Sequence, residues 1–256
     1  RNLAMFLQGK RILFFSAHLF GYQNDIRLAM ESVGAIVDYY DERPANNFLV
    51  KGVIRINRNL LAGYINHYYN KIIKETLQKE YDYVFFIKGE SISASNVRRL
   101  KQFHPEANFI IYHWDSIANN SNAQNLLPYF DRVFSFDKID CERLGLHFLP
   151  LFYTPDYANI PYYDKEIKYD MLFVGTTHSD RYKLVKRIEE QIIKMGGLCL
   201  TWFYFPSKIL YYKMKIQNSY LRQIPVHTFH FKPMSKELLL QLYAGSRIII
   251  DVQHPT

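Results

Sequence analysis

The sequence is poor in several features that define well-known protein classes. It contains two cysteines, Cys141 and Cys199, whose separation matches no zinc-binding or redox spacing, so we expect neither a disulfide framework nor a metal site. No run approaches the roughly 18–20 apolar residues that cross a bilayer. Residues 1–8 lack the apolar core and small-residue cleavage site of a signal peptide. These absences favour a protein of the reducing cytoplasm.

Motifs of nucleic-acid binding are also missing. No RNP, KH or zinc-finger pattern is present, and the 32 Lys and Arg residues are spread along the chain, so nucleic acid is not an expected partner. The formal net charge is nevertheless +8, with a pI near 9.2. A basic surface favours anions such as acidic lipid headgroups or phosphorylated small molecules, although an arbitrary excess of lysine explains the charge equally well.

Short apolar runs and amphipathic helical patterns alternate along the first part of the chain. The helices are expected at residues 24–33, 60–79 and 94–103, and the first is followed by Gly34 at its C-terminus. This alternation is typical of a parallel sheet covered on both faces. The predicted strands span residues 11–16, 35–40, 83–87, 108–113, 132–136 and 147–151.

The alternation stops at residues 152–170, which contain prolines and charges without periodicity, and then begins again. The second part predicts strands at 169–174, 198–205, 226–231 and 247–252, with helices at 179–195 and 235–243, the latter capped by Ser235. We therefore expect an α/β protein with two Rossmann-like doubly wound domains, residues 1–155 and 169–256, and a linker at 156–168. Such a domain commonly has five or six strands, so four predict that the second domain is incomplete at its C-terminus.

Polar residues follow the strands of the first domain. Ligands collect at the carboxyl ends of parallel strands, and a carboxylate there can act as a general base if burial raises its pKa. Each residue could instead cap the next helix, but together they indicate a ligand cleft. The residues are His18, Gly21 and Tyr22 after the first strand, Asp41, Glu42 and Arg43 after the second, Lys88 and Glu90 after the third, and His113 and Asp115 after the fourth.

The segment "FVGTTHSDRY" at 173–182 is the corresponding strand end in the second domain. Gly175 permits close approach of a ligand to the backbone, and Thr176 and Thr177 supply hydroxyl groups. A helix that begins here offers free N–H groups to an anion, and Arg181 could bind a phosphate with two hydrogen bonds. The segment is neither a Walker loop nor a G-x-G-x-x-G turn, and a simple capped turn explains it as well.

Six segments taken together resemble the GT-B glycosyltransferases, in particular bacterial polysaccharide-biosynthesis and lipopolysaccharide-biosynthesis proteins related to the CgeB-like group. The resemblance covers nearly the whole chain. The segments are "KRILFFSAHLFGYQNDI", "DYYDERPANN", "YDYVFFIKGE", "FIIYHWDS", "YDMLFVGTTHSDRY" and "LYAGSRIIIDVQHPT".

The resemblance implies a metal-independent enzyme without a cofactor that transfers a sugar from a nucleotide-sugar donor to a surface polysaccharide, a capsule or a lipid-linked glycan. The first domain would bind the acceptor, the second the donor, and transfer would occur between them. In relatives the last strand runs into a glycine-containing loop and a helix with a glutamate, which are not present after Thr256 and would leave the donor site incomplete.

The resemblance also assigns roles to the residues identified above. Asp115 or Glu90 would be the base, with His113 beside them. The donor would contact Gly175, Thr176, Thr177, Arg181, Gln253 and His254. The acceptor side would comprise His18, Gly21, Tyr22, Asp41, Arg43 and Lys88.

Two alternatives stay open. A non-catalytic scaffold or glycan-binding module with a degenerate donor site would have the same fold, whereas the missing G-x-G-x-x-G turn argues against an oxidoreductase or epimerase. The basic, aromatic segment 206–222 could hold the protein on the inner face of an acidic membrane or could form a plain amphipathic surface helix.

Overall fold

The computed structural model describes residues 6–19, 21–45, 58–120, 122–161, 166–177, 181–205, 207–217, 219–222 and 224–252. The chain divides into two compact units, of which the first ends at Phe152 and the second begins at Tyr153. Each unit is a parallel sheet with helices, so the predicted fold class of two Rossmann-like α/β domains is confirmed.

The first unit is built on six parallel strands in the order β2-β1-β3-β4-β5-β6. The order reverses at β1, so the carboxyl ends of β1 and β3 flank the switch point where open α/β sheets bind ligands. The strands are β1 (Arg11–Ser16), β2 (Ile36–Asp41), β3 (Tyr83–Ile87), β4 (Asn108–His113), β5 (Arg132–Ser135) and β6 (His147–Phe148).

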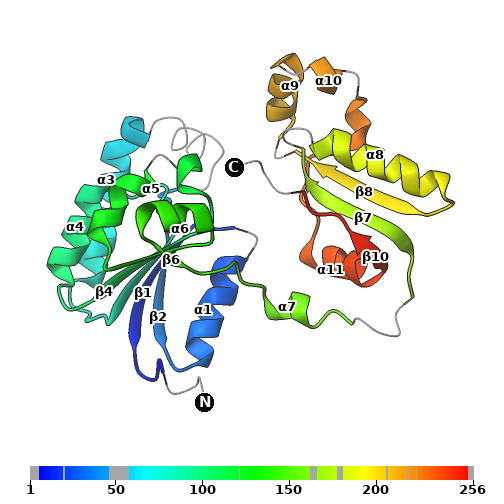
Figure 1. The fold of residues 1–256 in the computed structure, drawn as a ribbon. Helices are drawn as coiled ribbons and strands as arrows, with labels where there is room; N and C mark the ends of the chain where they lie inside the picture. Colours follow the sequence, from blue (N-terminus) through cyan, green and yellow to red (C-terminus); the bar gives the residue numbers. More distant parts are fainter. Residues whose placement is uncertain are drawn as a thin grey trace. The chain divides into compact units, whose positions relative to one another are not determined.

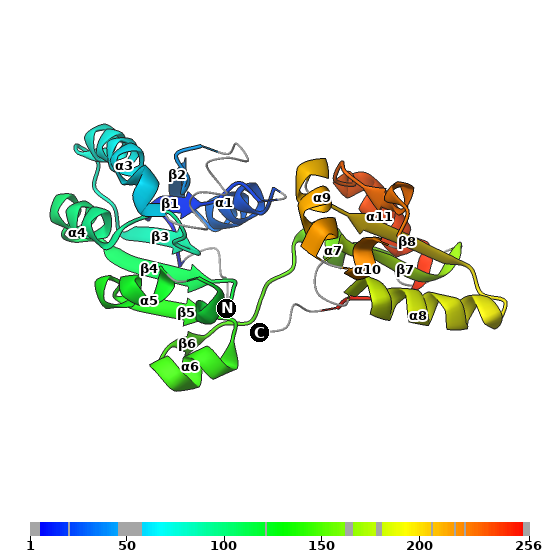
Figure 2. The same cartoon turned by 90° about the horizontal axis from the view of Figure 1, so that it is seen from above.

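Helices cover both faces of this sheet (Figures 1 and 2). The alternation of β1 explains the layers, because Ile12 and Phe14 pack with α1 (Tyr22–Ser32), whereas Leu13 and Phe15 pack with α3 and α4. The other helices are η2 (Arg58–Leu61), α3 (Ala62–Thr76), α4 (Ala94–Phe103), η3 (Ile117–Asn119), α5 (Ala123–Leu126), η4 (Leu127–Tyr129) and α6 (Lys138–Leu144).

The second unit has a four-stranded parallel sheet in the order β10-β7-β8-β9. Phe173, Phe203 and Phe229 from its strands form a core with Val185 of α8 and Tyr211 of α9. The elements are α7 (Pro155–Ala158), β7 (Tyr169–Thr176), α8 (Arg181–Lys194), β8 (Cys199–Tyr204), α9 (Lys208–Gln217), α10 (Ser219–Arg222), η5 (Val226–Thr228), β9 (Phe229–His230), α11 (Lys236–Ala244) and β10 (Ser246–Ile249).

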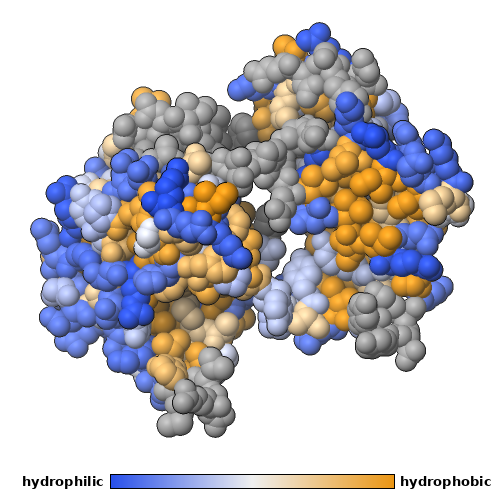
Figure 3. Space-filling view, viewed as in Figure 1, coloured by the Kyte–Doolittle hydropathy of each residue, from blue (hydrophilic) through white to orange (hydrophobic). Residues whose placement is uncertain are grey.

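Three strand predictions are wrong in part. Residues 226–228 form a 3-10 turn, so β9 keeps two residues, and β6 ends at Phe148 instead of residue 151. The last strand ends at Ile249, and Ile248 and Ile249 are nearly half exposed although a buried strand was expected. Within the described residues β10 pairs with β7 alone, which leaves one edge open, and Figure 3 shows a hydrophobic patch over β7 and β10.

Helices also appear where none was predicted. Asp137 accepts hydrogen bonds from the amides of Ile139 and Asp140 and thereby caps the short helix α6. In the predicted linker, Pro155–Ala158 forms the single turn α7, which Asp156 ties to Lys236 of α11 across 2.5 Å. The beginning of that segment therefore belongs to the second unit.

Candidate active site

A chain of charged side chains connects three strand ends of the first sheet. Arg43, after β2, forms an ion pair with Glu90, after β3. Lys88 Nζ lies 3.6 Å from Glu90 Oε1 and 2.5 Å from Oδ2 of Asp115, which follows β4. The structure therefore brings together four residues that the sequence analysis selected, at the edge that contains the switch point.

The exposed fraction of these four side chains rises from Arg43 to Asp115. The Arg43 side chain is 4% exposed, those of Lys88 and Glu90 are 13% and 14% exposed, and that of Asp115 is 50% exposed. Asp115 is thus the carboxylate that a ligand in solution can reach most easily, and the more buried members hold its lysine partner in place.

Glu42 is a buried member of this site to which the sequence analysis assigned no role, although it lies in the same "DER" triplet as Asp41 and Arg43. Its carboxylate is fully buried, and Oε1 accepts a 2.6 Å hydrogen bond from the amide of Ser91, while Oε2 has no hydrogen-bond partner in the part of the chain that the structure describes. Burial raises the pKa of Glu42 to about 7, and the negative charge of Glu90 adds to the shift, which the Ser91 amide and the nearby cations reduce. A carboxyl group near this value can exchange a proton at neutral pH.

The loop that follows β3 has an unusual backbone. Lys88 has a positive φ of 74°, a backbone conformation that residues other than glycine rarely adopt. Gly89 follows with φ 67°. The Asn122 amide holds this loop by donating hydrogen bonds to the carbonyl oxygens of Gly89 (2.9 Å) and Ile92 (2.8 Å). Positive φ at a non-glycine residue costs about 1–3 kcal/mol and is concentrated at functional sites.

His113 and Asp41 lie at the ends of β4 and β2. His113, the last residue of β4, is buried, and burial lowers its pKa to about 4, so the imidazole is neutral at neutral pH. Its Nε2 has no hydrogen-bond partner within the described residues. The Asp41 carboxylate accepts a 2.8 Å hydrogen bond from the Arg43 amide and thereby shapes the turn after β2.

The three residues selected after β1 lie at the start of α1. His18 is exposed, and its Nδ1 lies 2.9 Å from Nε2 of Gln23. Gly21 adopts φ 85° at the helix N-cap, a conformation that favours glycine. The ring of Tyr22 packs edge-on against that of Trp114, the residue that precedes Asp115, with 6.2 Å between the ring centroids.

Arg181 of the second unit lies at the switch point of its sheet. Its guanidinium donates hydrogen bonds to the carbonyl oxygens of Thr176, at the end of β7 (3.3 Å), and of Val252, beyond β10. Burial lowers the pKa of Arg181, and its Nε has no partner among the described residues. Arg181 thus joins the ends of two neighbouring strands at the edge where open α/β sheets bind ligands.

The glycine and threonine residues beside Arg181 are tightly enclosed. A Cβ atom on Gly175 would lie 2.9 Å from Cζ of Phe173, so a side chain is excluded there. Thr177 is buried, and its amide donates a 3.3 Å hydrogen bond to the Tyr204 carbonyl oxygen. Gln253 and His254 lie outside the described residues, so their assignment stays a prediction.

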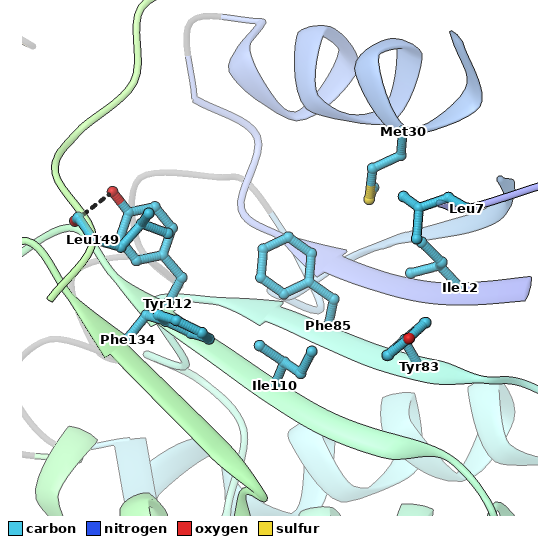
Figure 4. Close-up of a pocket in the computed structure, with 9 residues that line it drawn as sticks. All are labelled: Leu7, Ile12, Met30, Tyr83, Phe85, Ile110, Tyr112, Phe134 and Leu149. Carbon is cyan, nitrogen blue, oxygen red and sulfur yellow. Dashed lines mark hydrogen bonds between the residues drawn. The ribbon is translucent and has the colours of Figure 1, made fainter. Parts of the chain in front are cut away.

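An apolar groove of about 260 Å³ lies on the α1 face of the first sheet, apart from the charged chain (Figure 4). Phe85 and Ile110 of the sheet and Met30 of α1 line it, and Tyr112 closes one end with a hydrogen bond to the Leu149 carbonyl oxygen (3.2 Å). Among the described residues that line it there is no Asp, Glu, Lys, Arg or His side chain.

Two features are absent from the described residues. Among them no group of three or more His, Cys, Asp or Glu side chains is arranged to hold a metal ion. No helix in the described part of the chain is long and apolar enough to cross a membrane.

Comparisons with known proteins identify fold neighbours and no family. No family model matches the sequence, and no curated protein matches it. A transcriptional regulator of Clostridium difficile 630 is 11% identical over 85% of this chain and 57% of its own, with a TM-score of 0.35. The spinosyn rhamnosyltransferase SpnG, solved with thymidine diphosphate, is 7% identical over 91% of this chain and 73% of its own, with a TM-score of 0.46. At these TM-scores and identities, neither neighbour defines the function of this chain.

Proposed function

We propose that the chain is a glycosyltransferase of the GT-B type that transfers a sugar from a nucleotide-sugar donor to a hydroxyl group of a surface polysaccharide or lipid-linked glycan. The observation that carries the proposal is the chain of acidic and basic side chains at the carboxyl edge of the first sheet, which ends in the half-exposed Asp115. The acceptor class comes from the sequence resemblance alone.

Asp115 is the group that removes the proton of the acceptor hydroxyl. Its contact with Lys88 keeps the carboxylate oriented, and Lys88 is itself positioned by Glu90 and by the strained loop after β3. A base must lie within hydrogen-bond reach of the proton that it removes, which Asp115 satisfies better than the more enclosed Glu90. Glu42, whose pKa is about 7, can take up or release a proton near neutral pH, and its charge acts on Glu90 and Lys88.

The donor side of the proposal lies in the second unit. The leaving group of a nucleotide sugar is a nucleoside diphosphate, whose negative charge grows as the glycosidic bond breaks. Arg181 supplies a fixed positive charge at the switch point, and α8 begins at this residue with its positive dipole end. A Cβ atom on Gly175 would lie 3.4 Å from Nη1 of Arg181, so the glycine lets the guanidinium lie close to the end of β7.

Thermal unfolding with a panel of nucleotide sugars and nucleoside diphosphates tests this proposal. A ligand at 100 times its dissociation constant adds about 2.7 kcal/mol to the free energy of unfolding, so a specific donor should raise the midpoint clearly. We expect one nucleotide to stabilise the protein with and without its sugar. If no nucleotide and no nucleotide sugar shifts the midpoint, while a glycan does, the chain is a glycan-binding module and the proposal is wrong.

A further inference from the structure

The second unit contains a long segment without any acidic residue. Between Glu190 and Glu237 the sequence has no Asp or Glu, whereas seven positions are Lys or Arg. The net charge of the whole chain is +8, so this segment accounts for nearly all of it. The seven residues are Lys194, Lys208, Lys213, Lys215, Arg222, Lys232 and Lys236.

Helix α9 lies in the middle of this segment and has apolar residues on two opposite sides. Tyr211 on the inner side is fully buried, and its ring centroid lies 5.3 Å from those of Phe205 and Phe229. On the outer side, Ile209 is 73% exposed, Tyr212 53% and Ile216 72%. Their spacing of three and four residues aligns the three side chains in one stripe along the helix, which is labelled in Figure 1.

Lysines border this stripe. At 3.6 residues per turn, Lys208 lies on one side of the stripe and Lys213 on the other, and both are exposed. No acidic residue of the described chain forms an ion pair with Lys208, Lys213 or Lys215, whereas Glu189 pairs with Lys186 on α8.

A helix with exposed aliphatic side chains between lysines that have no ion pair among the described residues matches the boundary between lipid headgroups and acyl chains. The aliphatic groups enter the apolar layer, and the lysines contact the phosphates, each contributing to attraction by an acidic surface. A nucleic acid would use the lysines but would leave the two isoleucines against phosphate and water. The combination therefore favours lipid over nucleic acid.

We propose that α9 docks the second unit on an acidic lipid surface, with Ile209, Tyr212 and Ile216 inserted at the headgroup boundary and Lys208 and Lys213 on the lipid phosphates. This inference does not depend on glycosyl transfer, because it uses none of the residues of the candidate active site. It gives the protein a place at a membrane surface without a membrane-spanning helix in the described chain.

Sedimentation of the protein with vesicles tests the inference. The wild type should bind phosphatidylcholine vesicles that contain phosphatidylglycerol and should stay in solution with pure phosphatidylcholine. The double variants Ile209→Ser/Ile216→Ser and Lys208→Ser/Lys213→Ser should each bind about tenfold more weakly or less, since both the apolar and the charged contributions are needed. Tyr212→Trp should show a blue-shifted emission with the acidic vesicles only.

Matched controls separate this docking from a general effect of charge or apolar surface. Ile193→Ser removes another half-exposed isoleucine, on α8, and Lys183→Ser removes an exposed lysine of the same helix; both should bind like the wild type. Thermal midpoints establish that each variant is folded. The proposal would be overturned by equal binding to both vesicle types, by no binding to either, or by full binding of the isoleucine variant. It would also be overturned if duplex DNA bound the wild type and the isoleucine variant equally well.

Discussion

Glu42 makes the stability of the folded protein depend on pH between about 4.5 and 7. Its pKa of about 7 in the folded protein is above that of an exposed glutamate, so the folded state binds the proton more tightly than the unfolded state. The associated stability is present in full below about pH 4.5 and is lost as the pH rises through about 7. Glu42→Gln removes this dependence while keeping an oxygen for the Ser91 amide.

We therefore expect Glu42→Gln to match the wild type in acid and to exceed its free energy of unfolding by about 3 kcal/mol above pH 7. Urea unfolding at several pH values measures the difference. Glu106→Gln, which removes an exposed carboxylate, controls for the loss of one negative charge. A difference between wild type and Glu42→Gln that stays constant from pH 4 to pH 8 contradicts a raised pKa.

His113 acts in the opposite direction over part of the same range. Burial lowers its pKa to about 4, so the unfolded state binds the proton more tightly and stability falls as the pH drops from about 6.5 to about 4. As the pH falls, the stability that the wild type loses through His113 offsets the stability that it gains through Glu42. The free energy of unfolding of Glu42→Gln should consequently fall more steeply on acidification than that of the wild type, and an equally shallow fall would show that this offset is absent.

Lys88 tests whether the loop after β3 stores backbone strain. Lys88→Ala and Lys88→Gly both remove the ammonium group, but only glycine adopts φ 74° without a steric cost. Lys88→Gly should therefore be more stable than Lys88→Ala by about 1 kcal/mol, after allowance for the greater flexibility of glycine in the unfolded chain. Chemical denaturation measures the pair, and an alanine variant as stable as the glycine variant would rule out strain.

The sequence predicted part of the candidate site at this scale. Arg43, Lys88, Glu90 and Asp115 could be selected because the carboxyl ends of parallel strands share one edge of the sheet. Glu42 could not be preferred over Asp41, because its burial depends on the loop at Ser91, which is 49 residues away in the sequence. The hydrogen bonds of Arg181 to the carbonyl oxygens of Thr176 and Val252 were equally inaccessible, since they require the pairing of β7 with β10.

At the scale of single elements, Gly89 lies in the loop after β3, close to the side chains of Ile111 and Leu126. A Cβ atom there would lie 2.9 Å from Cδ1 of both Ile111 and Leu126, and its φ is 67°. Gly145 has the same φ but no atom within 4 Å of the added Cβ, which makes it a matched control. Gly145→Ala should cost about 1 kcal/mol from φ alone, and Gly89→Ala about 1–3 kcal/mol more from overpacking.

Thermal or chemical unfolding of the two alanine variants gives this comparison directly. If both lose the same free energy of unfolding, the loop is not locked by Ile111 and Leu126, and the rigid positioning of Lys88 loses its structural basis.

Elements with long, clear patterns were predictable, and short ones were not. The strands at 11–16, 83–87 and 108–113 and the helix at 94–103 agree with the structure because each has an unbroken apolar pattern and a clear boundary. The helix α6 has only seven residues, so its periodicity is too short to detect, although Asp137 and Gly145 mark its two ends. The exposure of β10 depends on which strands pair with it, which its own residues do not encode.

At the scale of the whole molecule, the repeated alternation of strands and helices predicted two α/β units, and the structure contains them. The strand order of each sheet and therefore its switch point follow from long-range pairing, which no local pattern contains. The assignment of acceptor to the first unit and donor to the second stays a proposal. Its chemistry depends on Asp115, the exposed end of the charged chain.

The most direct measurement is the release of nucleoside diphosphate from the nucleotide sugar that stabilises the protein, in the presence of a lipid-linked or polysaccharide acceptor. We expect Asp115→Asn to lower this rate by about 100-fold or more, as loss of a general base does. Asp156→Asn is the matched control, because Asp156 is 52% exposed and lies 2.5 Å from Lys236, much as Asp115 is 50% exposed and lies 2.5 Å from Lys88. Its rate should equal that of the wild type, and wild-type release by folded Asp115→Asn would contradict the account.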